Sequence, residues 1–291
     1  MRQSIPDQTL EKRVQEHYAA LSEQLRKAAD YVLSHPLDIA SRPLRAISTE
    51  SHVSPATFSR LSRALGYRNF EQMRDISRLS VGQQVMSLSE KAERLRSGKP
   101  SGQSMLARQS AACIANIETF QNSIDERKLE QASSLLCNAR KVVLVGALAS
   151  TGFIEYMSYL AQFIGANWTI AGRMGASLGS EIANLDKGDV VFVVTMSPYA
   201  RRAIGAAKLA RAAGADVILI TDAMACPSLA QATHGFVVPT NSPQFFSSYA
   251  VAIVLIETLI AMIVATSEAD VTASIQKAEA NNQVLGEYLT E

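Results

Sequence analysis

The sequence has few cysteines and none of the features that mark a protein for export. The three cysteines, Cys113, Cys137 and Cys226, are scattered, and neither a CxxC pair nor a Cys/His metal-ligand spacing is present. We therefore expect no zinc site, no disulfide framework, no metal or organic cofactor, and a reducing compartment, the cytoplasm. The first residues lack the apolar core of a signal peptide, so none is expected.

Long apolar runs are also scarce. The longest one, residues 249–266, is slightly short for a membrane span and carries Glu257 near its centre. A buried helix of an α/β domain is therefore the better interpretation. Of the 291 residues, 47% are hydrophobic and 19% are charged, which allows a sizeable core and argues against overall disorder. This length corresponds to one large domain or two ordinary ones.

The chain has no large net charge, but one of its segments is clearly basic. The formal net charge is +1, yet residues 40–80 hold seven arginines and three acidic residues. This local excess of positive charge is what contact with nucleic-acid phosphates requires, and overall neutrality does not argue against it.

Residues 53–66 predict a short helix with defined ends. Ser54 is a typical N-cap, Pro55 fits the first helical position, and Gly66 fits the residue that follows the last turn. One face is apolar and the other is small, hydroxylated and basic, which is typical of a helix in a DNA major groove and equally of an ordinary capped surface helix. The inward residues are expected to be Phe58, Leu61, Ala64 and Leu65. The outward residues are expected to be Ser54, Pro55, Ala56, Thr57, Ser59, Arg60 and Arg63.

The flanking segments favour the DNA-binding alternative. Residues 9–34 have helical periodicity up to Pro36, and a second helical segment starts near Pro43. A turn of residues 50–53 then leads into the capped helix, and Asn69 caps a further one. A helix, a short turn and a second capped helix form the helix-turn-helix layout.

Residues 9–79 resemble the N-terminal domain of the RpiR/MurR family of bacterial transcription regulators. The matching positions are residues 27–33, 53–54, 60, 65–67 and 70. His52 stands where the family usually has a turn glycine, and histidine adopts positive φ more readily than most other residues. The resemblance implies binding to double-stranded operator DNA. The residues expected to read it are Ser54, Thr57, Ser59, Arg60 and Arg63, with Arg42, Arg45 and Arg68 on the phosphate backbone.

A connector follows, and then the pattern changes to alternating helices and short apolar strands. We expect the DNA-binding domain at residues 1–80, a linker at 81–103, and a second domain at 104–291. Alternating strands and helices predict an open, doubly wound, mainly parallel α/β sheet. The predicted strands are residues 141–145, 167–170, 189–195, 216–221 and 235–238, and the predicted helices are 104–123, 126–139, 150–164, 174–183, 200–213 and 247–266. This domain resembles the sugar isomerase (SIS) domain.

Ligands of such sheets bind beyond the C-terminal ends of the strands, where three polar loops are expected. The loops are residues 146–152, 195–202 and 221–222. In SIS domains the first two hold a sugar phosphate, and the resemblance carries that role to Gly146, Ser150, Thr195 and Ser197. Hydroxyls and charge in the same loops add Thr151, Tyr199, Arg201 and Thr221 as candidate effector-binding residues.

Three departures from the family pattern bear on the ligand. Leu148 replaces a glycine of the first loop, and Pro198 and Ala200 replace a glycine and a hydroxyl of the second. Hydrogen bonds to a phosphate are lost in this way, although Arg201 or Arg202 can restore the charge. We therefore expect an anionic effector other than a standard sugar phosphate, such as a sugar acid. Alternatively, both arginines are solvated first-turn residues.

Catalysis is not expected. His234 is interpreted as a surface residue, Glu155 and Glu181 as helical-face carboxylates, and Glu257 as a buried paired group, with none beside another titratable residue. The sequence therefore predicts a metabolite-sensing transcription regulator that forms a dimer or a tetramer. Whether it activates or represses transcription does not follow from the sequence. The alternatives are a sugar-phosphate isomerase with an appended helical domain and a regulator that acts on a protein partner. The apolar segments 104–123 and 247–266 are candidates for either a subunit interface or the core.

Overall fold

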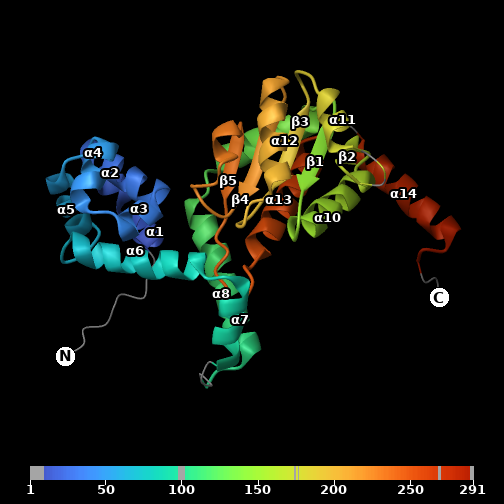
Figure 1. The fold of residues 1–291 in the computed structure, drawn as a ribbon. Helices are drawn as coiled ribbons and strands as arrows, with labels where there is room; N and C mark the ends of the chain where they lie inside the picture. Colours follow the sequence, from blue (N-terminus) through green and yellow to red (C-terminus); the bar gives the residue numbers. More distant parts are fainter. Residues whose placement is uncertain (1–9, 98–101, 174, 176, 268–269, 289–291) are drawn as a thin grey trace. The chain divides into compact units, whose positions relative to one another are not determined.

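A computed structural model describes residues 10–97, 102–173, 175, 177–267 and 270–288. The chain divides into two compact units (Figure 1). One contains the residues up to Met105 together with Pro243–Phe246, and the other contains Leu106–Ser242 and the residues from Ser247 onward. The first is helical and the second is built around a sheet, as the sequence predicts.

The helical unit consists of short helices. The segment 9–34 was expected to be helical, and its helical structure is interrupted at Leu21. A further helix, which was not expected, starts at Pro36, where proline occupies the first helical position. The predicted connector is largely helical as well. The elements are α1 (Leu10–His17), a 3₁₀ turn η1 (Tyr18–Ala20), α2 (Glu23–Ser34), α3 (Pro36–Ser41), α4 (Leu44–Ser51), α5 (Pro55–Ala64), α6 (Phe70–Val85) and α7 (Leu88–Ser97).

The core of this unit is centred on Phe58 of α5. Its ring packs edge-on against Tyr31 of α2 and Phe70 of α6, with ring centroids 6.2 and 5.9 Å apart. Edge-to-face contacts of this kind add to the free energy of apolar burial. Phe58 is fully buried, so α5 is fixed to its neighbours on one side, and its opposite side is left free.

Five parallel strands form the sheet of the second unit, in the order β2-β1-β3-β4-β5. Leu144 at the centre of β1 is paired with Ile170 on one side and with Phe192 on the other. The predicted parallel sheet is therefore confirmed, and its order reverses between β1 and β3, the place where doubly wound sheets bind ligands. The strands are β1 (Val142–Gly146), β2 (Trp168–Ile170), β3 (Val190–Val194), β4 (Asp216–Thr221) and β5 (His234–Val237).

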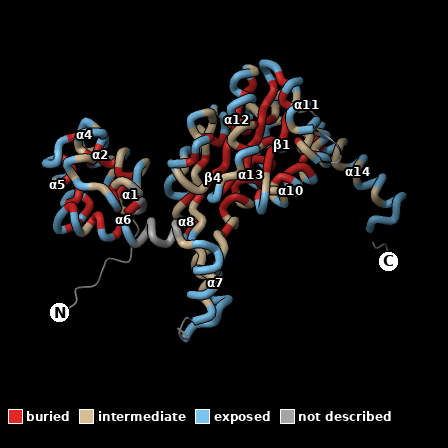
Figure 2. The backbone as a smooth tube through the Cα atoms, viewed as in Figure 1, coloured by how far each residue is buried: buried red, intermediate tan, exposed pale blue. Residues whose placement is uncertain are grey.

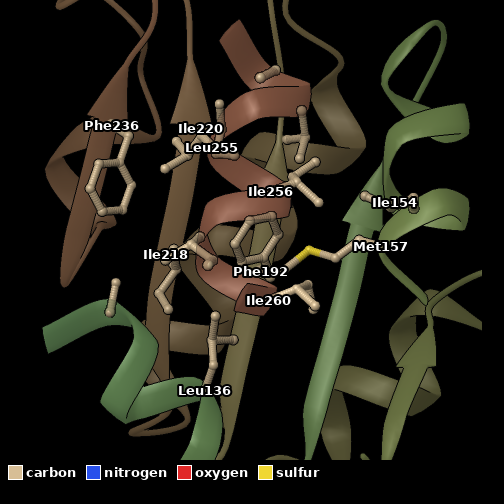
Figure 3. Packing of buried hydrophobic residues seen from close by; sticks show 14 of the residues in the cluster. Leu136, Ile154, Met157, Phe192, Ile218, Ile220, Phe236, Leu255, Ile256 and Ile260 are labelled. Atoms are coloured by element: carbon tan, nitrogen blue, oxygen red, sulfur yellow. The ribbon is translucent and has the colours of Figure 1, made fainter. Parts of the chain in front are cut away.

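Helices cover both faces of the sheet. Alternate strand residues point to opposite sides, so Leu144 and Phe192 pack on one face, and Val143 and Val191 on the other. The first face is covered by α9, α10 and α13 (Figure 3), and the second by α11 and α12. The central strands β1 and β3 are buried along their length and β4 nearly so, whereas the edge strands β2 and β5 are mostly of intermediate burial (Figure 2). The helices are α8 (Met105–Ser123), α9 (Glu126–Asn138), α10 (Ser150–Phe163), α11 (Leu178–Ala183), α12 (Arg201–Ala212), α13 (Ala250–Thr266) and α14 (Val271–Leu285), with a 3₁₀ turn η2 (Leu229–Gln231).

The longest apolar run, α13, is a core helix. Leu255, Ile256 and Leu259 are buried against the sheet, but Glu257 is exposed and accepts a hydrogen bond from the Tyr156 hydroxyl (2.8 Å). The expectation of a buried Glu257 is therefore wrong. Among the described helices, no single one is long and apolar enough to cross a membrane, and α13 passes that test only together with α14, across a 115° bend.

Candidate DNA-reading helix and effector site

The ends of α5 are fixed by the residues predicted to fix them. The Ser54 Oγ accepts a hydrogen bond from the Thr57 amide (3.2 Å), and Pro55 occupies the first turn. At the other end Gly66 adopts φ 81°, and the amides of Gly66 and Tyr67 donate to the carbonyls of Arg63 (3.0 Å) and Ser62 (2.8 Å). These two bonds form a Schellman motif, which satisfies carbonyls that the end of a helix leaves free. The capped helix is therefore confirmed.

The exposed face of α5 differs from the predicted one at two positions. Thr57 was expected on the surface, but only 4% of it is exposed, because its hydroxyl lies 2.9 Å from the Ser54 Oγ within the cap. Ala64 was expected to be buried and is exposed. Ala56, Arg60 and the Arg63 side chain lie on one exposed stripe, at the i, i+4, i+7 spacing of a helix face.

The turn before α5 contains a strained residue. His52, which takes the place of a family glycine, adopts the left-handed conformation at φ 54° and ψ 26°. The prediction that histidine can replace the turn glycine is therefore confirmed. The turn is also shorter than expected, because α4 continues to Ser51.

The arginines of this unit divide into two groups. Arg74 is buried and donates to the carbonyls of Ile39 (3.2 Å) and Arg42 (2.9 Å), and Arg78 donates to that of Ala40 (2.8 Å). Arg42 is paired with Asp38 and Glu50. These three therefore hold α3 and α4 in place, so part of the positive charge predicted for residues 40–80 has partners within the unit. The arginines without a carboxylate partner among the described residues of this unit include Arg45, Arg60, Arg63 and Arg68, all exposed.

In the second unit, the loop after β1 turns closely over the start of α10. A Cβ at Gly146 would lie 2.7 Å from the Ser150 carbonyl oxygen, so a side chain does not fit there. Leu148 adopts φ 56°, the conformation that the glycine it replaces would favour, and its side chain is 72% exposed. Leu148 therefore places an exposed apolar side chain on this loop.

An open hollow of about 510 Å³ lies at this end of the sheet. Its volume is in the range of small-molecule sites. Three segments contribute to it: the loop after β1, the residues that follow β2, and the start of α12. Its lining residues are Gly146, Ala147, Leu148, Thr151, Gly172, Arg173, Ala200, Arg201 and Arg202.

The predicted effector residues are only partly brought together there. Gly146, Thr151 and Arg201 line the hollow. Ser150, Thr195 and Thr221 are buried and are not among the lining residues. Gly172 and Arg173 were absent from the predicted set, and Arg202 was named only as an alternative to Arg201 for restoring the charge. The signal for Arg173 was available, because it follows the end of a predicted parallel strand, and such ends meet at one edge of the sheet.

Ser197 and Tyr199 belong to a neighbouring polar group. The Ser197 amide donates to the Asp222 Oδ2 (3.0 Å), and the peptide bond between Ser197 and Pro198 is cis. Burial, and then the nearby Asp222 carboxylate, raise the pKa of Tyr199 above its ordinary value. The Tyr199 hydroxyl is thus held in its neutral form, which an unshifted tyrosine also has at physiological pH.

None of the groups weighed for catalysis is among the lining residues of the hollow. Glu155 pairs with Arg173 (3.2 Å) and Glu181 with Lys141 (2.6 Å), so the expectation that neither lies beside another titratable residue is wrong. His234 begins β5, at the end of the sheet opposite to the hollow. In the described part of the chain, no three of the His, Cys, Asp and Glu residues are grouped as metal ligands would be.

Comparisons with known proteins agree with the two units. Residues 8–80 match the model of the helix-turn-helix domain of the rpiR family, and residues 135–262 match that of the SIS domain. The chain is 23% identical over 216 residues to the HTH-type transcriptional regulator HexR of Escherichia coli, covering 72% of this chain and 71% of HexR. It is 25% identical to the uncharacterized HTH-type transcriptional regulator YbbH of Bacillus subtilis, covering 67% and 68% of the two chains.

Two solved structures share the fold. The sugar isomerase domain of an RpiR transcription factor from Sphaerobacter thermophilus matches 61% of this chain and 99% of its own, with a TM-score of 0.58 and 22% identity. The NanR protein of Vibrio vulnificus, solved in complex with ManNAc-6P, matches 95% and 99% of the two chains, with a TM-score of 0.58 and 20% identity.

The fold and these relatives define a transcriptional regulator with a helix-turn-helix domain and a SIS domain. More specifically, its N-terminal domain is a helix-turn-helix domain of the rpiR family type, and its second domain is a SIS domain.

Proposed function

We propose that the chain binds operator DNA through α5 and that a small anionic metabolite in the hollow of the SIS domain alters this binding. The observation that carries the proposal is the exposed stripe of α5, on which Arg60 and Arg63 lack a carboxylate partner among the described residues. The Arg60 guanidinium donates only to the Thr57 hydroxyl (3.3 Å) among the bonds of the described residues. A rigid capped helix whose guanidinium groups are not held by carboxylates suits contact with base edges and phosphates in the major groove.

Arg45 and Arg68 have a different role in this proposal. Both are exposed, and the backbone of Arg68 is fixed because its amide donates to the Gln72 Oε1 (2.7 Å) beside the cap of α6. They contact phosphate and set affinity and register more than sequence choice. Arg42 takes part only if DNA phosphate replaces its ion pairs with Asp38 and Glu50.

A single short helix contacts too few base pairs for a selective operator. We therefore expect a homodimer, or a tetramer made of dimers, on a two-fold symmetric site with half-sites about one helical turn apart or a multiple of it. The effector acts by linkage, because it must bind the DNA-competent and the DNA-incompetent arrangements with different affinity.

The charge of the hollow supports an anionic effector. Arginines are the charged residues of its lining, and the NanR relative was solved with a sugar phosphate, ManNAc-6P. Leu148, Pro198 and Ala200 still remove backbone space or donors that the family pattern offers to a phosphate. The expected effector is therefore a sugar derivative whose anionic groups are recognised by arginine.

The test is a fluorescence-anisotropy titration of the full chain against the DNA upstream of its own gene, with a scrambled duplex as control and a series of salt concentrations. Nanomolar, salt-dependent binding that exceeds binding to the scrambled duplex at least a hundredfold is expected. Equal binding to both duplexes, at this and neighbouring promoters, would contradict the proposal and direct attention to isomerase assays of the same chain.

A further inference from the structure

The lining of the hollow is unusual in its charge. The described lining residues include Arg173, Arg201 and Arg202, and none of them is a carboxylate. Each guanidinium presents paired N–H groups that match the oxygens of a carboxylate or phosphate. Together the three arginines make the lining positively charged.

The three arginines are not equivalent. Arg173 is paired with Glu155, with the Arg173 guanidinium nitrogen 3.2 Å from Glu155 Oε1, and both side chains are about half exposed. For Arg201 and Arg202, no carboxylate partner is found among the described residues. Two positive charges of the hollow are therefore left for a ligand to neutralise.

Gly172 leaves room for the Arg202 side chain. The guanidinium of Arg202 lies against Gly172 so closely that a Cβ at this position would overlap it. Gly172 also has φ 70°, which a residue with a side chain rarely adopts. Gly172 thus limits where the Arg202 guanidinium can lie, and a side chain at this position would shift it.

A second segment of the chain lines the same hollow. It consists of the loop after β1 and Thr151 in the first turn of α10, where Thr151 adds a hydroxyl that can donate to an anion. The amides of Ser150 and Thr151 already donate to the carbonyls of Ala147 (3.1 Å) and Leu148 (3.2 Å). Because Gly146 and Thr151 come from a different segment than Arg201 and Arg202, the hollow can hold two groups of one ligand.

We propose that Arg201 and Arg202 determine specificity for a second anionic group, so that the effector is a sugar-sized molecule with two oxyanionic groups. The group is a carboxylate or a phosphate, and it is additional to the one held by the loop after β1. This proposal rests on the proposed function, since it specifies the ligand of the same hollow.

The experiment is isothermal titration calorimetry of the full chain with two matched pairs of sugars. Glucose 6-phosphate is compared with 6-phosphogluconate, which adds a carboxylate, and fructose 6-phosphate with fructose 1,6-bisphosphate, which adds a phosphate. We expect the doubly anionic member of at least one pair to bind about 10- to 150-fold more tightly, the range of a charge-assisted hydrogen bond. The pair that shows the difference identifies the second group.

Variants assign the effect to the arginines. Arg202→Met should bring the two affinities of that pair to within about threefold, and Gly172→Ala should do the same while leaving the arginine in the chain. Arg127→Met, which removes an exposed arginine of α9, is the matched control and should leave the ratio unchanged.

Equal affinities within both pairs, or an affinity ratio that Arg202→Met leaves unchanged, would overturn this inference and leave the proposed function standing. If none of the four sugars binds at millimolar concentration, both the inference and the effector half of the proposed function are wrong. The operator titration described above tests the DNA-binding half independently.

Discussion

The turn before α5 and the turn before α10 each contain a residue other than glycine with positive φ, in two very different units. His52 and Leu148 are the residues other than glycine with positive φ in the described part of the chain, at 54° and 56°. After His52 comes a helix that presents Arg60 and Arg63 outward, on a face that needs no cavity. After Leu148 comes a helix whose first residue, Ser150, is buried, so binding there depends on the surrounding hollow.

The two units differ in how the residues that would contact a ligand are distributed over the elements of the fold. In the helical unit a single element carries the contacts, and the core residue Phe58 holds it from behind. In the α/β unit, three loops from separate strands meet at the edge where the strand order reverses, and each contributes part of the site. The first kind of site follows from local sequence, whereas the second requires the topology of the sheet.

The largest effect is expected from removing the core of either unit. Phe58→Ala should lower the free energy of unfolding of the helical unit by about 3–5 kcal/mol and abolish DNA binding, because the cavity lies directly beneath α5. Phe192→Ala, in the centre of β3, should lower the free energy of unfolding of the α/β unit by a similar amount. Differential scanning calorimetry should show two transitions, each shifted by one variant. A single transition shifted equally by both would contradict the independence of the units.

The next effect is expected at the exposed stripe of α5. Arg60→Met and Arg63→Met should each weaken operator binding by about 1–3 kcal/mol and relax sequence preference, because a base contact is lost. Fluorescence anisotropy with operator and scrambled duplexes measures both quantities. Arg127→Met in the other unit is the control, and a loss of equal size in that variant would indicate a general charge effect.

A smaller effect of a different kind is expected at Arg68. Arg68→Ala should weaken binding to both duplexes alike and lower the slope of log affinity against log salt by about one. An unchanged slope would remove Arg68 from the phosphate-contacting set.

The smallest effect is expected from restoring glycine to the two turns. His52→Gly and Leu148→Gly should each raise the free energy of unfolding by about 0.5–1 kcal/mol, since relief of the left-handed strain exceeds the entropy that glycine costs. Both side chains are exposed, so little burial is lost. Chemical denaturation measures the change, and destabilisation by Leu148→Gly would show that the Leu148 side chain makes contacts that offset the strain.

The sequence predicted the parts of the molecule that depend on neighbouring residues. Ser54, Pro55 and Gly66 define α5 because caps act within one turn, and the strands were found because buried parallel strands are continuous apolar runs. The role of Arg74 was not predictable, since its carbonyl partners Ile39 and Arg42 lie 35 and 32 residues away. The burial of Thr57 depends on a hydroxyl contact within the cap that helical periodicity does not describe.

The site of the second unit was predicted as a set of loops, and its lining was predicted only in part. The loops follow from the general rule for parallel sheets, so Gly146 and Arg201 were found. Arg202 was recognised as a charge but not assigned to the site. Its contact with Gly172 joins the start of α12 to the residues after β2, and only the assembled sheet brings these segments together.

The central claim is that ligand in the hollow controls DNA binding by α5. The most direct test is to measure the operator affinity of the full chain with and without a saturating concentration of the sugar that binds most tightly in calorimetry. A change of about 5- to 150-fold in operator affinity, reduced in Arg202→Met at the same sugar concentration, is the predicted result. An operator affinity that stays the same in the presence of bound sugar would contradict the claim.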